Sequence, residues 1–145
     1  MVTRVDRLDL AKLEPLRKEA LAEGYSFVER LASEYADGSL RFDKSGEALF
    51  AIFEDEELMA IGGLTGYEAL RDPTIGRVRR LYVLDRCRRH GYGRLIVEAI
   101  IEEARKYYRL LTLRTPNALA SAFYERLGFQ TAPPVAETTH WIKLV

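Results

Sequence analysis

The segment from Arg88 to Ile100, RRHGYGRLIVEAI, constrains the fold more than any other part of the chain. Two glycines, Gly91 and Gly93, follow a pair of arginines and lead directly into an amphipathic helical pattern. Residues 76 to 84, just before it, have the composition of a strand. The first amides of a helix lack partners within the helix and carry the positive end of its dipole. A strand, a glycine loop and a helix in this order therefore predict a site for a phosphate-bearing ligand.

Two other phosphate-binding motifs do not fit this loop. A dinucleotide fingerprint requires a third glycine where this chain has Ile96. A nucleotide triphosphate loop requires Gly-Lys-Ser/Thr where it has Gly93, Arg94 and Leu95. A tight strand-to-helix turn with solvated arginines is the structural alternative to an anion site.

Two segments, LYVLDRCRRHGYGR (81–94) and NALASAFYERLGF (117–129), together resemble the GCN5-related N-acetyltransferase (GNAT) family. The first is similar to the family's acetyl-CoA loop, Arg/Gln-x-x-Gly-x-Gly/Ala, here Arg88, Gly91 and Gly93. The second is similar to its later motif, Asn-x-x-Ala-x-x-Phe-Tyr-x-x-x-Gly-Phe, here Asn117, Ala120, Phe123, Tyr124, Gly128 and Phe129. Order and spacing agree across about residues 76 to 130.

The resemblance implies an α/β (α+β) fold with a mixed, mostly antiparallel central sheet that splays at the acetyl-CoA loop and is flanked by about four helices. Hydrophobic periodicity independently predicts strands at 2–7, 48–53, 58–64, 76–84, 109–115 and 140–145, and helices at 9–21, 27–37, 91–108 and 118–127. We expect a capping box from Ser26 to Glu29, Pro15 in a first helical turn, and a bulge or a close neighbour at Gly62 and Gly63. One domain spans residues 1–145 in this interpretation.

The resemblance also implies which residues hold acetyl-CoA. The strand before the loop offers backbone groups to the pantetheine arm, and the amides from Arg89 to Arg94 hold the pyrophosphate. Asn117 binds the pantetheine, and Tyr124 faces the sulfur. The complete predicted set is Leu81, Tyr82, Val83, Arg88, Arg89, His90, Gly91, Tyr92, Gly93, Arg94, Asn117, Ala120, Phe123 and Tyr124.

Acyl transfer requires a neutral amine, a donor for the oxyanion and a proton for the departing thiolate. We assign the Val83 amide as the oxyanion donor and Tyr124 as the general acid. Considered apart from the family, Tyr124 reads as a packing residue and Asn117 as a helix cap. Direct transfer is favoured over an acetyl-cysteine route through Cys87, because only His90 lies near it as a partner.

The general base is the main departure from the family pattern. Many relatives carry a glutamate early in the strand before the loop, and Arg77 occupies that position here. Glu34, Glu68, Tyr67 or a water chain are the alternatives. Arg77, Arg79 and Arg80 either form surface salt bridges or attract an acidic substrate or the CoA phosphates.

Composition bounds the partners and the compartment. Lysine plus arginine equal aspartate plus glutamate at 22 each, so we expect neither nucleic acid nor a membrane as partner. A single cysteine, no apolar span and no signal-peptide pattern predict a cytoplasmic protein. His90 and His140 lack companions at metal-ligand spacing, so no metal is expected.

We expect an acetyl-CoA-dependent N-acetyltransferase acting on a small-molecule amine or on a peptide or protein amino group, with residues 24–45 and 62–68 choosing the acceptor. The alternatives are an acyl-CoA-binding regulatory module with weak or no catalysis, and an interaction domain whose loop only grips a phosphate. A homodimer through a strand edge or residues 140–145 is plausible.

Overall fold

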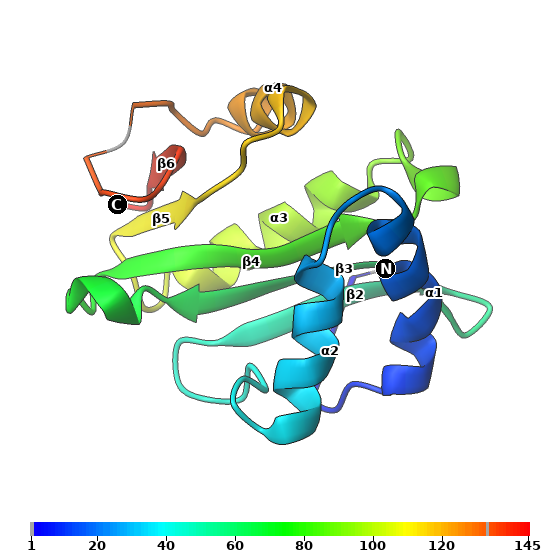
Figure 1. The fold of residues 1–145 in the computed structure, drawn as a ribbon. Helices are drawn as coiled ribbons and strands as arrows, with labels where there is room; N and C mark the ends of the chain where they lie inside the picture. Colours follow the sequence, from blue (N-terminus) through cyan, green and yellow to red (C-terminus); the bar gives the residue numbers. More distant parts are fainter. Residues whose placement is uncertain (1, 133) are drawn as a thin grey trace.

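One six-stranded sheet forms the centre of the computed structural model, which describes residues 2–132 and 134–145 (Figure 1). The strands lie in the order β1-β2-β3-β4-β5-β6, so spatial order follows sequence order. Their bounds are Val2–Arg4 (β1), Ala48–Glu54 (β2), Glu57–Gly66 (β3), Ile75–Val83 (β4), Leu110–Leu113 (β5) and His140–Lys143 (β6). All neighbours are antiparallel except β4 and β5, which are parallel.

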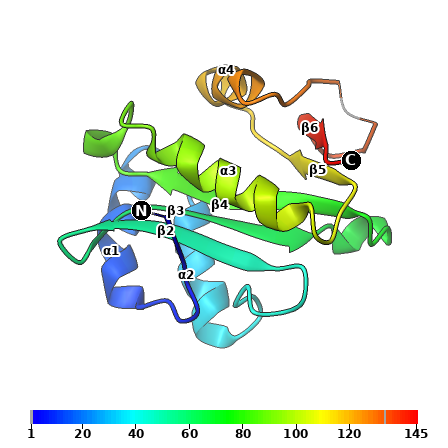
Figure 2. The same cartoon turned by 180° about the vertical axis from the view of Figure 1, so that it is seen from behind.

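The helices cover both faces of this sheet. On one face lie α1 (Leu10–Ala22) and α2 (Phe27–Asp37), and on the other lies α3 (Tyr92–Ala104), as Figure 2 shows from behind. The fourth helix, α4 (Ala118–Arg126), lies beside β5 and β6. Two short 3-10 helices, η1 (Glu68–Leu70) and η2 (Asp85–Cys87), stand before and after β4. The predicted mixed sheet with four flanking helices is confirmed.

Alternating residues of β2 supply both cores. Ala48, Phe50 and Ile52 pack with α3, while Leu49 and Ala51 pack with α1 and α2. The predicted apolar face of α3 is buried as expected. Such alternation is the period of a strand covered on both faces.

Glu103, the charged residue on the apolar face of α3, is also buried. It pairs at 3.0 Å with both Arg4 and Lys106. Burial opposes its ionisation, but the hydrogen bond from Lys106 and the charge of Arg4 outweigh it and lower the pKa of the carboxyl. A buried carboxylate is tolerated here because it is paired.

The glycine pair on β3 sits at a bulge, as predicted. Ile61 pairs with Tyr82 and Gly63 pairs with Arg79, so one β3 residue faces two β4 residues. A Cβ on Gly62 would lie 2.7 Å from Ile96 of α3. The absence of a side chain at Gly62 therefore allows β3 and α3 to pack closely at the bulge.

The sheet parts between β4 and β5. These strands pair only at Ile75↔Leu110, Gly76↔Leu111 and Arg77↔Thr112, and the rest of β4 has no pairing with β5. Figure 1 shows β5 turning away from β4 toward α4. The predicted splay lies where β4 runs into the glycine loop.

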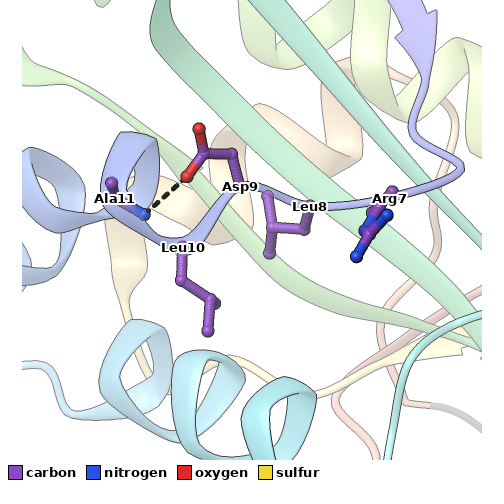
Figure 3. A pocket seen from close by; sticks show the side chains of 5 residues that line it. All are labelled: Arg7, Leu8, Asp9, Leu10 and Ala11. Carbon is purple, nitrogen blue, oxygen red and sulfur yellow. Dashed lines mark hydrogen bonds between the residues drawn. The ribbon is translucent and has the colours of Figure 1, made fainter.

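Two local predictions about the first helices are wrong. Asp9 caps α1 by accepting from the Ala11 amide at 3.0 Å (Figure 3). Because α1 begins at Leu10, Pro15 lies beyond the first turn. Ser26 has helical backbone angles and makes no side-chain cap, because its conformation is not the extended one that an N-cap needs. Glu29 instead accepts from Arg17 of α1 at 3.2 Å.

Several helices and strands are also shorter than their sequence patterns predict. α3 ends at Ala104 rather than at 108, and β1, β5 and β6 are shorter than predicted. The hollow drawn in Figure 3 is lined by Arg7, Leu8, Asp9, Leu10 and Ala11. All five belong to one short stretch, remote in sequence from the glycine loop.

Replacing Gly62 by alanine tests the contact at the bulge. The added methyl group meets Ile96 at 2.7 Å and Leu81 at 3.0 Å, so we expect a loss of about 1–3 kcal/mol in the free energy of unfolding. Urea unfolding measures it. Gly66→Ala is the matched control, because its nearest contact, the Tyr108 hydroxyl, lies at 3.4 Å. Equal stability of the two variants would contradict the close packing described here.

Candidate active site

The glycine loop presents a row of backbone amides. Gly91 has a φ of +82° and caps α3, and the first α3 amide bonded back to the loop is that of Leu95, to the Gly91 carbonyl at 3.0 Å. In the described chain no hydrogen-bond partner is found for the amides of Arg89, Gly91, Tyr92, Gly93 and Arg94. Only the His90 amide is engaged, by the Cys87 carbonyl at 3.3 Å. Free amides at the start of a helix are groups that can bind an anion.

The three arginines of the loop have different surroundings. Arg88 pairs with Glu23 at 2.9 Å, and its Nε donates to the Val83 carbonyl at 3.0 Å. Arg94 pairs with Glu98 at 3.3 Å. Arg89 makes no ion pair with any described residue, so its charge is the least compensated of the three.

A polar network behind Arg88 was not predicted from the sequence. The Tyr82 hydroxyl lies 2.6 Å from Glu19 and 2.7 Å from Glu23, and Glu19 also accepts from the Asp85 amide at 2.9 Å. Burial, together with the two carboxylates, raises the pKa of Tyr82, whereas the hydrogen bond from Arg88 lowers the pKa of Glu23. The network fixes the end of β4 to α1. Its only sequence signal is a pair of glutamates four residues apart, one in the last turn of α1 and the other at its C-cap.

The register of β4 determines where the Val83 backbone points. Val83 pairs with Ala60, and the Leu84 amide donates to the Met59 carbonyl at 2.9 Å. In an antiparallel ladder this makes Val83 a non-hydrogen-bonded position, so its N–H and C=O face away from β3. The Val83 carbonyl accepts a hydrogen bond from Arg88 Nε, and the Val83 amide points toward the parting of β4 and β5.

Residues from three predicted segments converge at this parting. A Cβ on Gly93 would lie 3.2 Å from the Phe123 ring and 3.6 Å from Val83. Leu81, Tyr92 and Ala120 are partly buried against the same core as Phe123. The structure thus brings together β4, the loop and α4, as expected. The Tyr92 hydroxyl, however, donates to Glu54 of the β2–β3 hairpin.

Asn117 caps α4, which is one of the two roles that the sequence left open. Its Oδ1 accepts from the Leu119 and Ala120 amides at 2.8 and 3.3 Å, so it caps α4. Its Nδ2 donates to the Tyr25 hydroxyl at 2.9 Å, which joins α4 to the α1–α2 connection.

Tyr124 is buried, with 6% of its surface exposed. Its ring lies 5.1 Å from that of Phe123, 5.5 Å from Phe129 and 6.0 Å from His140, and no hydrogen bond of its hydroxyl is found within the described residues. Burial raises its pKa, so the phenol is protonated at neutral pH. The Tyr124 phenol therefore holds a proton that it could donate, and it is not a candidate base.

The candidate bases have distinct environments. Glu34 forms an ion pair with Arg80 at 2.9 Å, so the arginine offsets the charge of the carboxylate. Tyr67 is buried beneath Arg77, whose guanidinium lies 4.5 Å from its ring centroid. Glu68 is exposed on η1. Of the three arginines of β4, only Arg80 forms a salt bridge among the described residues, so the salt-bridge alternative holds for Arg80 and not for Arg77 or Arg79.

Cys87 and His140 are both buried and contact neighbouring side chains. Cys87 is buried with its Sγ 3.4 Å from the Met59 sulfur, and burial raises the pKa of the thiol. His140 is buried between Ser121 and Thr139, at 2.9 and 2.8 Å. Across the described chain no cluster of three potential metal ligands occurs.

Comparison with known proteins identifies the family. The model of the acetyltransferase (GNAT) family matches residues 13–129. The chain belongs to the GNAT acetyltransferase family. No curated protein gives a significant sequence match.

Solved structures of other proteins are similar to this acetyltransferase. A protein from Exiguobacterium sp. 255-15, assigned as an acetyltransferase, is 31% identical over 99% of this chain and 92% of its own, with a TM-score of 0.87. A GNAT acetyltransferase from Streptococcus pneumoniae is 17% identical over 100% and 99%, with a TM-score of 0.73. An N-acetyltransferase from Staphylococcus aureus Mu50 is 15% identical over 100% and 98%, also at 0.73. The last two share the fold.

Membership of this family implies use of acetyl-CoA and of an amine as acetyl acceptor. The free loop amides and the Val83 N–H suit a diphosphate and a carbonyl oxygen respectively. Within residues 2–132 and 134–145, the acetyltransferase has no helix of the length and apolarity that crossing a membrane requires.

The Cys87 thiol of the native acetyltransferase is predicted to resist alkylation. Burial and a raised pKa keep it protonated and covered, so iodoacetamide at neutral pH should modify it at least about tenfold more slowly than in urea-unfolded protein. Mass spectrometry measures both rates. Equally fast modification of native protein would instead indicate an accessible nucleophile.

Proposed function

We propose that residues 1–145 form one acetyltransferase domain that transfers the acetyl group of acetyl-CoA to a primary amine by direct attack in a ternary complex. The observation that supports this most is the row of free amides from Arg89 to Arg94 next to the parting of β4 and β5. The first amides of any helix lack intrahelical partners, so it is their position beside this parting, together with the family match, that favours an anion site over a solvated turn. An anion site leaves them available.

The proposed binding roles follow from the surrounding backbone. The loop amides and Arg89 hold the diphosphate, Leu81 and Val83 offer backbone groups to the pantetheine arm, and Asn117 donates to it after releasing Tyr25. Phe123 and Ala120 supply the apolar wall on the α4 side. The side chain of Arg88 has a positioning role, because it binds the Val83 carbonyl and Glu23.

The proposed reaction forms an N–C bond between the amine and the acetyl carbon and breaks the C–S bond of the thioester. The amine loses one proton, and the departing sulfur gains one, so the products are an N-acetyl amide and free CoA. The Val83 amide donates to the carbonyl oxygen as negative charge develops there. Tyr124 donates to the sulfur. Thiols ionise near pKa 8.5 and tyrosine near 10, and burial raises the pKa of Tyr124 further, so this donation assists the reaction only moderately.

The buried thiol of Cys87 supports direct transfer over a covalent route, because a protonated, covered sulfur is a poor nucleophile. The regulatory-module alternative rests on Arg77, which stands where many relatives carry a glutamate. Thiol release from acetyl-CoA, followed over a panel of primary amines, separates the two. Amine-dependent release supports the transferase. Tight acetyl-CoA binding without release on any amine would favour the module.

Substitution of Tyr124 by phenylalanine tests its role as acid. We expect turnover to fall by on the order of 10² while the acetyl-CoA dissociation constant barely changes, because the ring keeps its contacts and loses only the proton donor. Steady-state kinetics and calorimetry measure the two effects. Tyr107→Phe, at an exposed tyrosine beyond α3, serves as control. Loss of binding in Tyr124→Phe would show a structural tyrosine instead.

A further inference from the structure

Two arginines of β4 lie together on the sheet face that α1 and α2 cover. Arg77 pairs with Thr65 across β3, and Arg79 pairs with Gly63, where a Cβ would meet Phe42 of the α1/α2 core at 2.4 Å. Alternate residues of a strand share a face. The Nη1 of Arg79 donates to Thr65 Oγ1 at 3.4 Å, in agreement with this placement.

Neither of these guanidinium groups has a carboxylate partner. No described carboxylate lies within 4.0 Å of Arg77 or Arg79, and Arg77 only stacks on the Tyr67 ring. The neighbouring Arg80 forms a salt bridge with Glu34 at 2.9 Å, its one such partner among the described residues. The Nε of Arg80 is buried and has no partner among the described residues. Three guanidinium groups thus share one carboxylate.

This arrangement is unfavourable without an anion from outside. Arg77 and Arg79 are partly buried. Desolvation, with repulsion from Arg80 and Arg77, lowers the pKa of Arg79 to about 10, and burial lowers the pKa of Arg77 as well. Partly buried cations are normally paired. The protein as a whole is neutral, so this excess of positive charge is local.

The position of the arginines fits the acceptor rather than CoA. The loop amides begin α3, and α3 lies on the opposite face of the sheet from α2 (Figures 1 and 2). Arg79 precedes Val83 by four residues, which is roughly 13 Å along an extended strand, and the bulge at Arg80 shortens that path. A long arginine side chain shortens it further. One small molecule can therefore place an amine near Val83 and an anion at Arg79.

We propose that the acetyl acceptor is an amino carboxylate, a small primary amine that also carries a carboxylate, and that Arg79 and Arg77 bind this carboxylate. Arginine binds carboxylates through paired N–H donors, which fixes orientation as well as charge. The inference rests on the proposed transferase function, because it names the acceptor of that reaction. It also accounts for a basic residue at position 77.

Matched pairs of amines test the proposal. Each amino acid is compared with the amine that lacks only its carboxylate: lysine with cadaverine, phenylalanine with phenethylamine, and β-alanine with ethylamine. We expect kcat/KM, measured as CoA release at saturating acetyl-CoA, to be at least about tenfold higher for the carboxylate-bearing member of the accepted pair.

Variants locate the effect on the two arginines. Arg79→Gln and Arg77→Gln should each raise KM for the amino carboxylate by about tenfold, while KM for the matched amine and the acetyl-CoA dissociation constant stay unchanged. Arg79→Lys should restore part of the loss, because it keeps the charge without the paired donors. Arg7→Gln removes the same charge from an exposed position as control. Unfolding midpoints confirm that each variant folds.

The outcomes separate this proposal from the function on which it rests. Transfer to amines with no preference for the carboxylate, or an unchanged KM in both glutamine variants, overturns the amino-carboxylate acceptor and leaves the transferase standing. If the protein binds acetyl-CoA but none of the amines causes release of CoA, both the amino-carboxylate acceptor and the transferase function are overturned. A preference that disappears in Arg79→Gln, partly returns in Arg79→Lys and persists in Arg7→Gln supports the proposal.

Discussion

The parting of β4 from β5 is the constraint on which the site depends. Parallel pairing stops after Arg77↔Thr112, so the second half of β4 keeps its antiparallel bonds to β3 but has no partner on its other side. Unpaired backbone groups are unfavourable when they are buried away from water and ligands. The register directs the Val83 amide into this parting, and the bulge opposite Gly62 changes the course of β4 just before it.

Side chains from distant segments hold this open arrangement in place. Arg88 joins the Val83 carbonyl to Glu23, while Tyr82 joins β4 to Glu19 of the same helix. The glycine loop, in contrast, is stabilised by few bonds of its own, and its amides stay free. The division is physically consistent, because anchoring through side chains leaves the backbone groups for a ligand. The rest of the sheet closes around two well-packed cores.

Much of this organisation was predictable from the residues. The 3.6-residue period of α3 and the spacing of Arg88, Gly91 and Gly93 predicted the loop, and Asn117 was predicted as the cap of the next helix. The Glu19–Glu23 network was missed because its partners are more than 50 residues away in sequence and surface glutamates are usually solvated. The sequence could not choose between salt bridges and an external anion for Arg77, Arg79 and Arg80, because strand pairing decides which acids lie near each arginine, and only Arg80 contacts one.

Backbone amide chemical shifts on addition of CoA provide the most direct test of the central claim, that the free loop amides receive the diphosphate. In ¹H–¹⁵N spectra we predict that the largest changes fall on Arg89, Gly91, Tyr92, Gly93 and Arg94, with inorganic phosphate affecting the same amides more weakly. If CoA binds while these five resonances stay in place and others move, the loop is not the phosphate site and the account is wrong.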